Sequence, residues 1–150
     1  NYHPENSHVI PALIRRFHEA KIAQESAVVI WGTGKPKREF LYVDDLAKAC
    51  LHLMKIEKEV FWQNISPECS HLNIGTGIDC SIAQLAKLVS ETCSYKGIID
   101  FDTSRPDGTP RKLLNVSKVN KLGWSASTHL KDGLCKTYKD FLAHYAKLKA

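Results

Sequence analysis

The residues best suited to chemistry in this 150-residue chain are a tryptophan, an aspartate and several cations in predicted loops and at element edges. An arginine guanidinium can bind two oxygens of a diphosphate at once, and an aromatic ring can stack on a base or pack against a sugar. Such a combination is typical of a surface that binds a nucleotide sugar, but it is generic. The set comprises Arg16, Trp31, Lys35, Lys37, Arg38, Arg105, Asp107, Arg111 and Lys112.

The densest part of this set lies in the stretch WGTGKPKREFLYVDD, from Trp31 to Asp45. A short apolar run precedes Trp31, a glycine-containing turn with Lys35 and Lys37 follows it, and Arg38 opens a second run. Two interpretations fit this order. The stretch is either a binding site for an anionic ligand or a hairpin whose tip happens to be basic.

His8 is the candidate acid or base, because an imidazole exchanges protons near neutral pH. It lies at the predicted start of a helix, between polar neighbours, where it could face a cleft. A histidine that only bonds the backbone at the helix start fits the same position. Arg16 borders the apolar stripe of that helix and Arg15 points away from it, so Arg16 either binds a ligand or reaches past the stripe into water.

Two other motifs are incomplete. Gly32-Thr33-Gly34 and Gly75-Thr76-Gly77 do not extend to the GxGxxG pattern of a dinucleotide loop, so both are predicted to be tight turns. Tyr145 and Lys149 have the spacing of a reductase pair, but no serine or glycine loop precedes them in the right order. We regard this pair as accidental.

Cysteine and histidine spacing excludes several classes of protein. Five cysteines without a CxxC pair indicate reduced, buried thiols in a cytoplasmic protein. The seven histidines show no ligand spacing, so no metal site is expected. No apolar run approaches the length of a membrane span, and no signal peptide is visible.

The net charge of +5 is concentrated near one end of the chain. Residues 1–110 carry 12 Lys and Arg against 14 Asp and Glu, whereas residues 111–150 carry 9 against 2. Apolar positions interrupt these cations, which favours a solvated basic helix over a nucleic-acid interface. With 43% hydrophobic and 25% charged residues, the composition is that of one soluble globular domain.

Hydrophobic periodicity predicts helices and strands in alternation. Asn6 or Ser7 caps the first predicted helix, and Asp44 caps the second. The expected helices cover residues 8–23, 45–54, 80–93, 117–122 and 130–148, with Ser81 as a cap candidate in the third. The expected core positions of the second helix are Leu46, Ala49, Cys50, Leu53 and Met54. The expected strands cover residues 28–31, 38–43, 71–77, 97–102 and 113–118. This order predicts a mixed α/β fold in which helices pack on a small sheet.

Four stretches, in order and spanning nearly the whole chain, resemble the carboxyl-terminal half of the GDP-L-fucose synthase family. That family belongs to the extended short-chain dehydrogenase/reductase superfamily. One of the four contains REFLYVDD, which also occurs in related nucleotide-sugar epimerases and dehydratases. The stretches are HPENSHVIPALIRRFHEA, VVIWGTGKPKREFLYVDDLAKAC, HLNIGTGIDCSIAQLA and FDTSRPDGTPRKLLNVSKVNKLGW.

The resemblance implies a substrate-binding domain over residues 1–150, without the NAD(P)-binding Rossmann half. The implied parent enzyme epimerises C3 and C5 of GDP-4-dehydro-6-deoxy-D-mannose and reduces C4 with NADPH. His8 would be its acid/base residue and would also contact NADP. The implied substrate contacts, expected on one concave wall with His8 at its reacting end and Lys112 nearby, are Arg16, Trp31, Arg38 and Asp107.

The family's glycine phosphate loop, Ser-Tyr-Lys set and catalytic cysteine belong to the amino-terminal half and match nothing in this chain. We therefore expect a piece of a longer protein that is inactive alone. The parent would bind a GDP-sugar, form a homodimer and work in the cytoplasm. Two alternatives stay open: the substrate domain of another GDP-sugar dehydratase or 4-epimerase, and a nucleic-acid or protein-binding module that uses the basic last helix.

Overall fold

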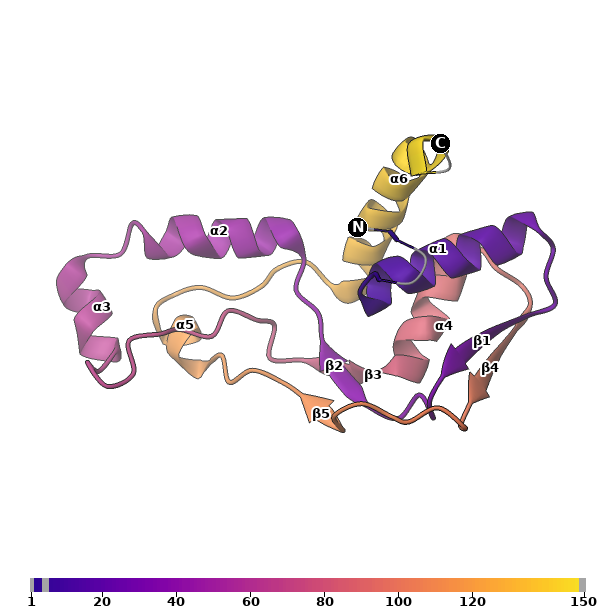
Figure 1. The fold of residues 1–150 in the computed structure, drawn as a ribbon. Coiled ribbons are helices and arrows are strands. Elements are labelled where there is room, and N and C mark those ends of the chain that lie inside the picture. Colours follow the sequence, from indigo (N-terminus) through magenta and orange to yellow (C-terminus); the bar gives the residue numbers. More distant parts are fainter. Residues whose placement is uncertain (1, 4–5, 149–150) are drawn as a thin grey trace. The chain divides into compact units, whose positions relative to one another are not determined.

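A computed structural model describes residues 2–3 and 6–148 of the chain, which folds into two compact units. The first unit contains residues 1–36, 80–110 and 131–150, and the second contains residues 37–79 and 111–130. Each unit is therefore built from segments that are distant in the sequence. The chain alternates helices with short strands (Figure 1), which confirms the predicted mixed α/β class.

In the first unit, three helices accompany two parallel strands. The helices are α1 (Val9–Ile22), α4 (Ile82–Cys93) and α6 (Leu130–Leu148). β1 (Ala27–Trp31) pairs in parallel with β4 (Ile98–Asp102), which places Trp31 opposite Asp102 (Figure 1). The largest fully buried side chains here come from all three helices: Ile14, Phe17, Leu85, Val89, Cys93 and Phe141.

The second unit contains α2 (Val43–Leu53), α3 (Lys58–Asn64) and α5 (Ser117–Lys121). β2 (Lys37–Glu39) pairs in parallel with β5 (Arg111–Lys112), so Arg38 lies opposite Lys112. Its small core centres on Ala49, Val119 and Trp124. β3 (Asp79–Ser81) falls where the chain passes from the second unit to the first. None of the helices among the described residues is long and apolar enough to span a membrane.

Several predicted elements are confirmed and others are wrong. Ser81 caps α4 in a capping box with Gln84, and the last helix has the predicted bounds. The predicted strands at 71–77 and 113–118 are not formed, and β2 is shorter than expected. The hairpin interpretation is also wrong, because β1 pairs with β4 and β2 pairs with β5. The sequence reading missed α3 and β3.

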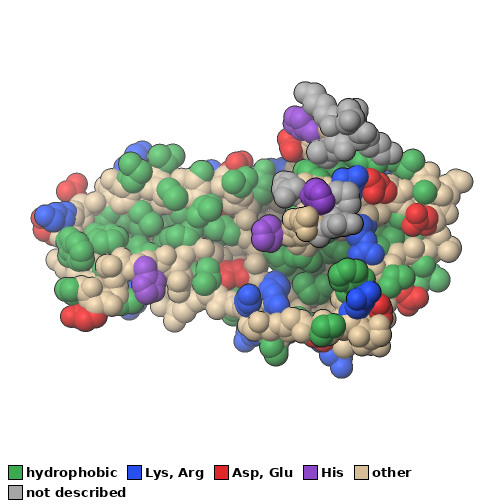
Figure 2. All heavy atoms as spheres, in the orientation of Figure 1, with side chains coloured by type: hydrophobic (Ala, Val, Ile, Leu, Met, Phe, Trp, Pro, Cys, Tyr) green, Lys and Arg blue, Asp and Glu red, His purple; other side chains and the backbone are tan. Residues whose placement is uncertain are grey.

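α2 departs from its predicted burial. Leu46 and Met54, both expected in the core, are 43% and 82% exposed. Cys50 is exposed as well, so Ala49 is the fully buried apolar residue of this helix. Figure 2 shows apolar side chains gathered on the surface of the second unit around α2 and α3. A helix with this much exposed apolar area is typical of one whose packing partner is another segment or molecule.

Asp45 is a buried charge in the first turn of α2, and its side chain is 1% exposed. Its carboxylate accepts hydrogen bonds from the backbone amides of Thr128 and Ser127, at 2.7 and 3.0 Å. Burial raises the pKa of Asp45, but the hydrogen bonds from Thr128 and Ser127 outweigh burial and lower the pKa from 3.8 to about 2. Asp44, predicted to cap this helix, is exposed, and Tyr42 is the N-cap residue.

We predict that Asp45 stabilises the protein above about pH 4 and that this contribution is lost as the pH falls toward 2. The sign follows from the lowered pKa, since the unfolded state takes up the proton first. The shift corresponds to about 2 kcal/mol. Urea unfolding at several pH values is expected to show a smaller acid-dependent loss of stability in Asp45→Asn than in the wild type. Asp44→Asn is the matched control, and parallel curves for wild type and Asp45→Asn would contradict the prediction.

Candidate functional site: the end of β1 and a basic pocket

Trp31 ends β1 with its side chain 67% exposed, and a tight turn follows it. The Gly32 amide donates to the Asp102 carbonyl at 2.9 Å, which extends the strand pairing by one residue. Gly32 then adopts a φ of +86°, a backbone conformation that glycine reaches without strain. The turn therefore begins at Gly32, the residue immediately after the exposed Trp31.

Asp107 ties the loop after β4 to this turn. Its Oδ1 accepts from the Thr33 amide at 2.8 Å, and its Oδ2 accepts from the Thr33 hydroxyl at 2.6 Å. These hydrogen bonds, with Lys35 adding a smaller attraction, lower the pKa of Asp107 below its ordinary value. Asp107 is thus a carboxylate at neutral pH, fixed against the turn that follows Trp31.

Two arginines from different segments reach β1. The Arg105 guanidinium lies 4.9 Å from the centre of the Trp31 ring, within the range of a cation–π contact. Arg16 of α1 donates from Nη2 to the Val29 carbonyl, two residues before Trp31. The guanidinium of Arg16 therefore docks on the backbone of β1. Arg15 is the more enclosed neighbour, with a 15% exposed side chain bound to Glu19, contrary to the predicted orientation.

The structure gathers some of the predicted site residues and not others. Arg16, Trp31 and Asp107 lie around the carboxyl end of β1. His8 is the N-cap residue of α1, about 12 Å along the helix from Arg16 at the usual rise per residue. Arg38 belongs to the second unit, so its grouping with the other three stays a prediction.

His8 is exposed, and its side chain makes no capping hydrogen bond. The alternative of a histidine that serves only to bond the helix start is therefore wrong. The backbone carbonyl of His8 accepts from the Ala12 amide at 3.0 Å, which is the first bond of the helix. The imidazole is left on the surface at the amino end of α1.

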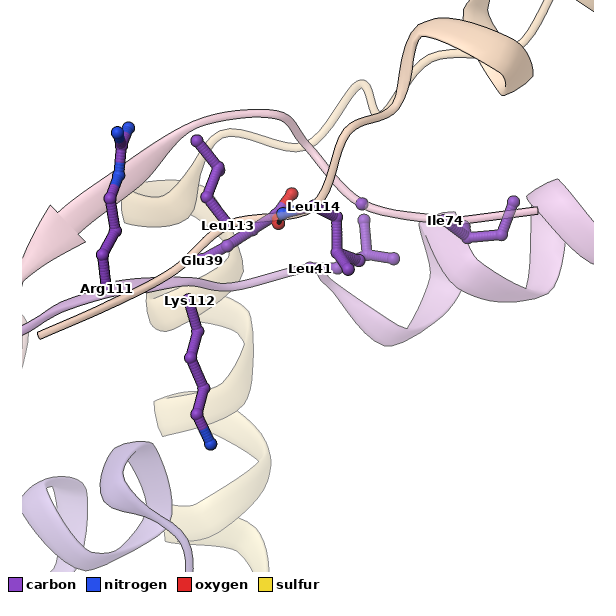
Figure 3. Close-up of a pocket in the computed structure, with 8 residues that line it drawn as sticks. Glu39, Leu41, Ile74, Arg111, Lys112, Leu113 and Leu114 are labelled. Atoms are coloured by element: carbon purple, nitrogen blue, oxygen red, sulfur yellow. Dashed lines mark hydrogen bonds between the residues drawn. The ribbon is translucent and has the colours of Figure 1, made fainter. Parts of the chain in front are cut away.

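The second unit contains a pocket of about 510 Å³ beside β2 and β5. Arg111 and Lys112 line it and point to opposite sides of β5 (Figure 3). Arg111 donates from Nε to Asp79 at 2.5 Å, and this hydrogen bond lowers the pKa of Asp79. The other lining residues are Glu39, Leu41, Ile74, Gly75, Leu113 and Leu114.

Glu39 organises this pocket, although the sequence did not single it out. Its Oε1 accepts from the amides of Thr76 and Gly77 at 2.5 and 2.7 Å. Its Oε2 accepts from the Leu114 amide at 2.8 Å. A side chain at Gly75 would collide with this carboxylate. One available signal was an acidic residue inside the apolar run that follows Arg38.

Both Gly-Thr-Gly turns are therefore occupied by carboxylates of this chain. Asp107 binds the turn at 32–34, and Glu39 binds the turn at 75–77. Asp107 takes the Thr33 amide and Glu39 takes the Thr76 and Gly77 amides, so a phosphate would have to displace a carboxylate from either turn. The prediction of two tight turns is confirmed. Among the residues that the structure describes, no three His, Cys, Asp or Glu side chains are placed to hold a metal ion.

Comparison with known proteins agrees with this architecture. Residues 1–75 match the NAD dependent epimerase/dehydratase family. The chain is 50% identical to GDP-L-fucose synthase of Escherichia coli K12 over 149 residues, 99% of this chain and 46% of that protein. It is also 50% identical to putative GDP-L-fucose synthase 2 of Arabidopsis thaliana, over 99% of this chain and 43% of that protein. The chain thus spans less than half the length of these curated relatives.

Solved structures show the same likeness. A GDP-6-OMe-4-keto-L-xylo-heptose reductase from C. jejuni is 34% identical with a TM-score of 0.84, covering 96% of this chain and 50% of its own. A GDP-L-fucose synthetase from Naegleria fowleri bound to NADP is 26% identical with a TM-score of 0.80, covering 97% of this chain and 43% of its own. The fold is accordingly that of part of an extended short-chain dehydrogenase/reductase. The chain belongs to the NAD-dependent epimerase/dehydratase family.

We predict that Glu39→Gln loosens the pocket without unfolding the protein. The amides of Thr76, Gly77 and Leu114 lose a charged acceptor, so their hydrogen exchange is expected to accelerate by about tenfold. Residue-resolved amide exchange measures this change. Glu57→Gln, at an exposed glutamate whose side chain makes no capping bond to α3, is the matched control. Unchanged exchange at all three amides would rule out the role given to Glu39.

Proposed function

We propose that this chain is the carboxyl-terminal, substrate-binding part of an enzyme that makes GDP-L-fucose. The complete enzyme would convert GDP-4-dehydro-6-deoxy-D-mannose by epimerisation at C3 and C5 and NADPH-dependent reduction at C4. The single observation that carries the proposal is 50% identity to the Escherichia coli GDP-L-fucose synthase over 99% of this chain. The cations and the aromatic ring at the end of β1 supply groups that such a substrate requires.

Each proposed substrate contact suits a different part of the ligand. The Arg16 and Arg38 guanidiniums would neutralise the diphosphate, since a guanidinium can bind two phosphate oxygens. Trp31, whose ring is exposed with Arg105 over it, would pack against the base or the sugar. Asp107 keeps acceptor capacity beyond its bonds to Thr33 and would take a hydroxyl of the sugar or ribose.

His8 would be the acid/base residue of the epimerisation. A ketone at C4 acidifies the protons on C3 and C5, so a nearby imidazole can deliver or remove a proton there. The exposed position of His8, with no capping bond to its side chain, leaves the ring available for this task. When bound, NADPH supplies the hydride for C4. This cofactor would be held mainly by residues outside the chain, because both Gly-Thr-Gly turns already bind carboxylates.

The amino-terminal half of the same enzyme is the proposed partner of this chain. The exposed apolar residues of α2 and α3 would lie against other parts of the protein. They include Val43 at 67%, Leu51 at 58% and Trp62 at 48% exposure. We further propose a homodimer of the full-length enzyme in the cytoplasm, as the family resemblance implies.

Product analysis of the full-length protein tests the function. Incubation with GDP-4-dehydro-6-deoxy-D-mannose and NADPH is expected to give GDP-L-fucose, identified by NMR of the product sugar. A GDP-6-deoxy sugar reduced at C4 with unchanged C3 and C5 would instead show a reductase without epimerase activity. The 150-residue chain alone is the control and is expected to oxidise no NADPH. Turnover by that chain alone would contradict the proposed division of the site.

We predict that His8→Asn in the full-length enzyme lowers kcat by about a hundredfold or more while KM changes little. The reason is that the imidazole would act on protons in the transition state, whereas asparagine preserves polarity without exchanging a proton. Steady-state kinetics with the keto sugar measures both constants. His3→Asn, at an exposed histidine near the same helix, is the matched control. An unchanged kcat in His8→Asn would remove His8 from the catalytic set.

A further inference from the structure

A second group of reactive side chains, none of them assigned to the substrate, lies in the second unit. The sulfur of Cys69 is 3.4 Å from the Lys118 ammonium nitrogen and 4.0 Å from both ring nitrogens of His71. These three residues line a pocket of about 140 Å³. Its remaining lining residues are Asn73, Asn115 and Ser117.

Local sequence positions two members of this group, Cys69 and Lys118. Ser66-Pro67-Glu68-Cys69 forms a turn in which the Cys69 amide donates to the Ser66 carbonyl at 3.0 Å, and proline at its second position favours that geometry. Lys118 lies in α5, directly after Ser117. The Ser117 amide donates to the Asn115 side chain at 3.0 Å, which anchors the start of that helix.

We propose that Cys69, Lys118 and His71 form a thiol-oxidation site at which hydrogen peroxide converts Cys69 to a sulfenic acid. This proposal does not depend on the function proposed above. Cysteine attacks peroxide as the thiolate, and a nearby ammonium stabilises the negative charge on sulfur. The polar groups of Asn73 and Asn115 give the pocket hydrogen-bonding partners for a peroxide molecule.

In this step hydrogen peroxide is the oxidant and the Lys118 ammonium is the proton donor. The sulfur of the thiolate bonds to one peroxide oxygen while the O–O bond breaks, so sulfur is oxidised by two electrons and peroxide is reduced. The leaving hydroxide takes a proton from the Lys118 ammonium and departs as water, and solvent then returns a proton to the lysine. The second peroxide proton stays on the sulfenic acid oxygen. A thiol reductant restores the cysteine through a mixed disulfide.

The other cysteines provide internal comparisons. Cys50 and Cys135 are exposed, whereas Cys69 and Cys80 are both only partly so. Accessibility alone would therefore favour oxidation of Cys50 and Cys135. Cys93 is buried, and burial raises its pKa to about 12, which leaves it protonated at neutral pH. Preferential reaction of Cys69 would thus point to its neighbours rather than to exposure.

The test treats the full-length protein with limited hydrogen peroxide and traps sulfenic acid with a dimedone probe. Peptide mass spectrometry then measures labelling at Cys50, Cys69, Cys80 and Cys135 separately. Cys69 is expected to label fastest. Lys118→Met, which keeps the length of the side chain without its charge, is expected to slow Cys69 labelling by on the order of tenfold.

Lys121→Met is the matched control, because Lys121 is an exposed lysine of the same short helix. It is expected to leave the labelling rates of all the measured cysteines unchanged. Circular dichroism of both variants checks that they fold. Faster labelling of another measured cysteine than of Cys69, or equal Cys69 rates in the wild type and Lys118→Met, would overturn the proposal.

Discussion

The binding of a carboxylate by a Gly-Thr-Gly turn is the interaction on which both units depend. In the first unit Asp107 reaches back 74 residues to Thr33, and in the second Glu39 reaches forward 37 residues to Thr76. In the first unit the carboxylate binds one backbone amide of the turn, and in the second it binds two. A charged acceptor stabilises these amides more than a neutral one would, so each contact holds its loop strongly.

In both contacts a negative side chain binds backbone groups of the same chain. Asp107 and Glu39 bind backbone amides, and the Asp79 carboxylate likewise binds a group of this chain, the Arg111 guanidinium. Two of the cations proposed to bind the substrate donate to backbone carbonyls. Arg16 donates to the Val29 carbonyl and Arg38 to the Lys37 carbonyl. A diphosphate oxygen is a stronger acceptor than a carbonyl oxygen, so a diphosphate could replace these two carbonyls as the acceptor in the proposed site.

The sequence predicted the parts of the fold that depend on local patterns. Leu13, Ile14 and Phe17 repeat at helical spacing and are buried, and Ser81 caps α4 as its spacing from Gln84 allows. It did not predict interactions between distant segments. Nothing near Asp45 indicates that its partners are Ser127 and Thr128, 82 and 83 residues away. Among the candidate site residues, Arg16, Trp31 and Asp107 could be named from local motifs, but their meeting at β1 required the strand pairing.

Two of the wrong predictions depend on what lies beside the segment rather than on its own pattern. Residues 71–77 have a strand-like sequence, yet a strand forms only where a neighbour can pair with its amides and carbonyls. The apolar positions of α2 follow a helical period, yet Leu46 and Met54 are exposed. The amides of Thr76 and Gly77 bond to the Glu39 side chain instead of a neighbouring strand. The apolar residues of α2 call for a packing partner that the described residues do not supply, as in a domain that packs against a larger half. Their exposure supports the proposed place of the chain within a longer enzyme.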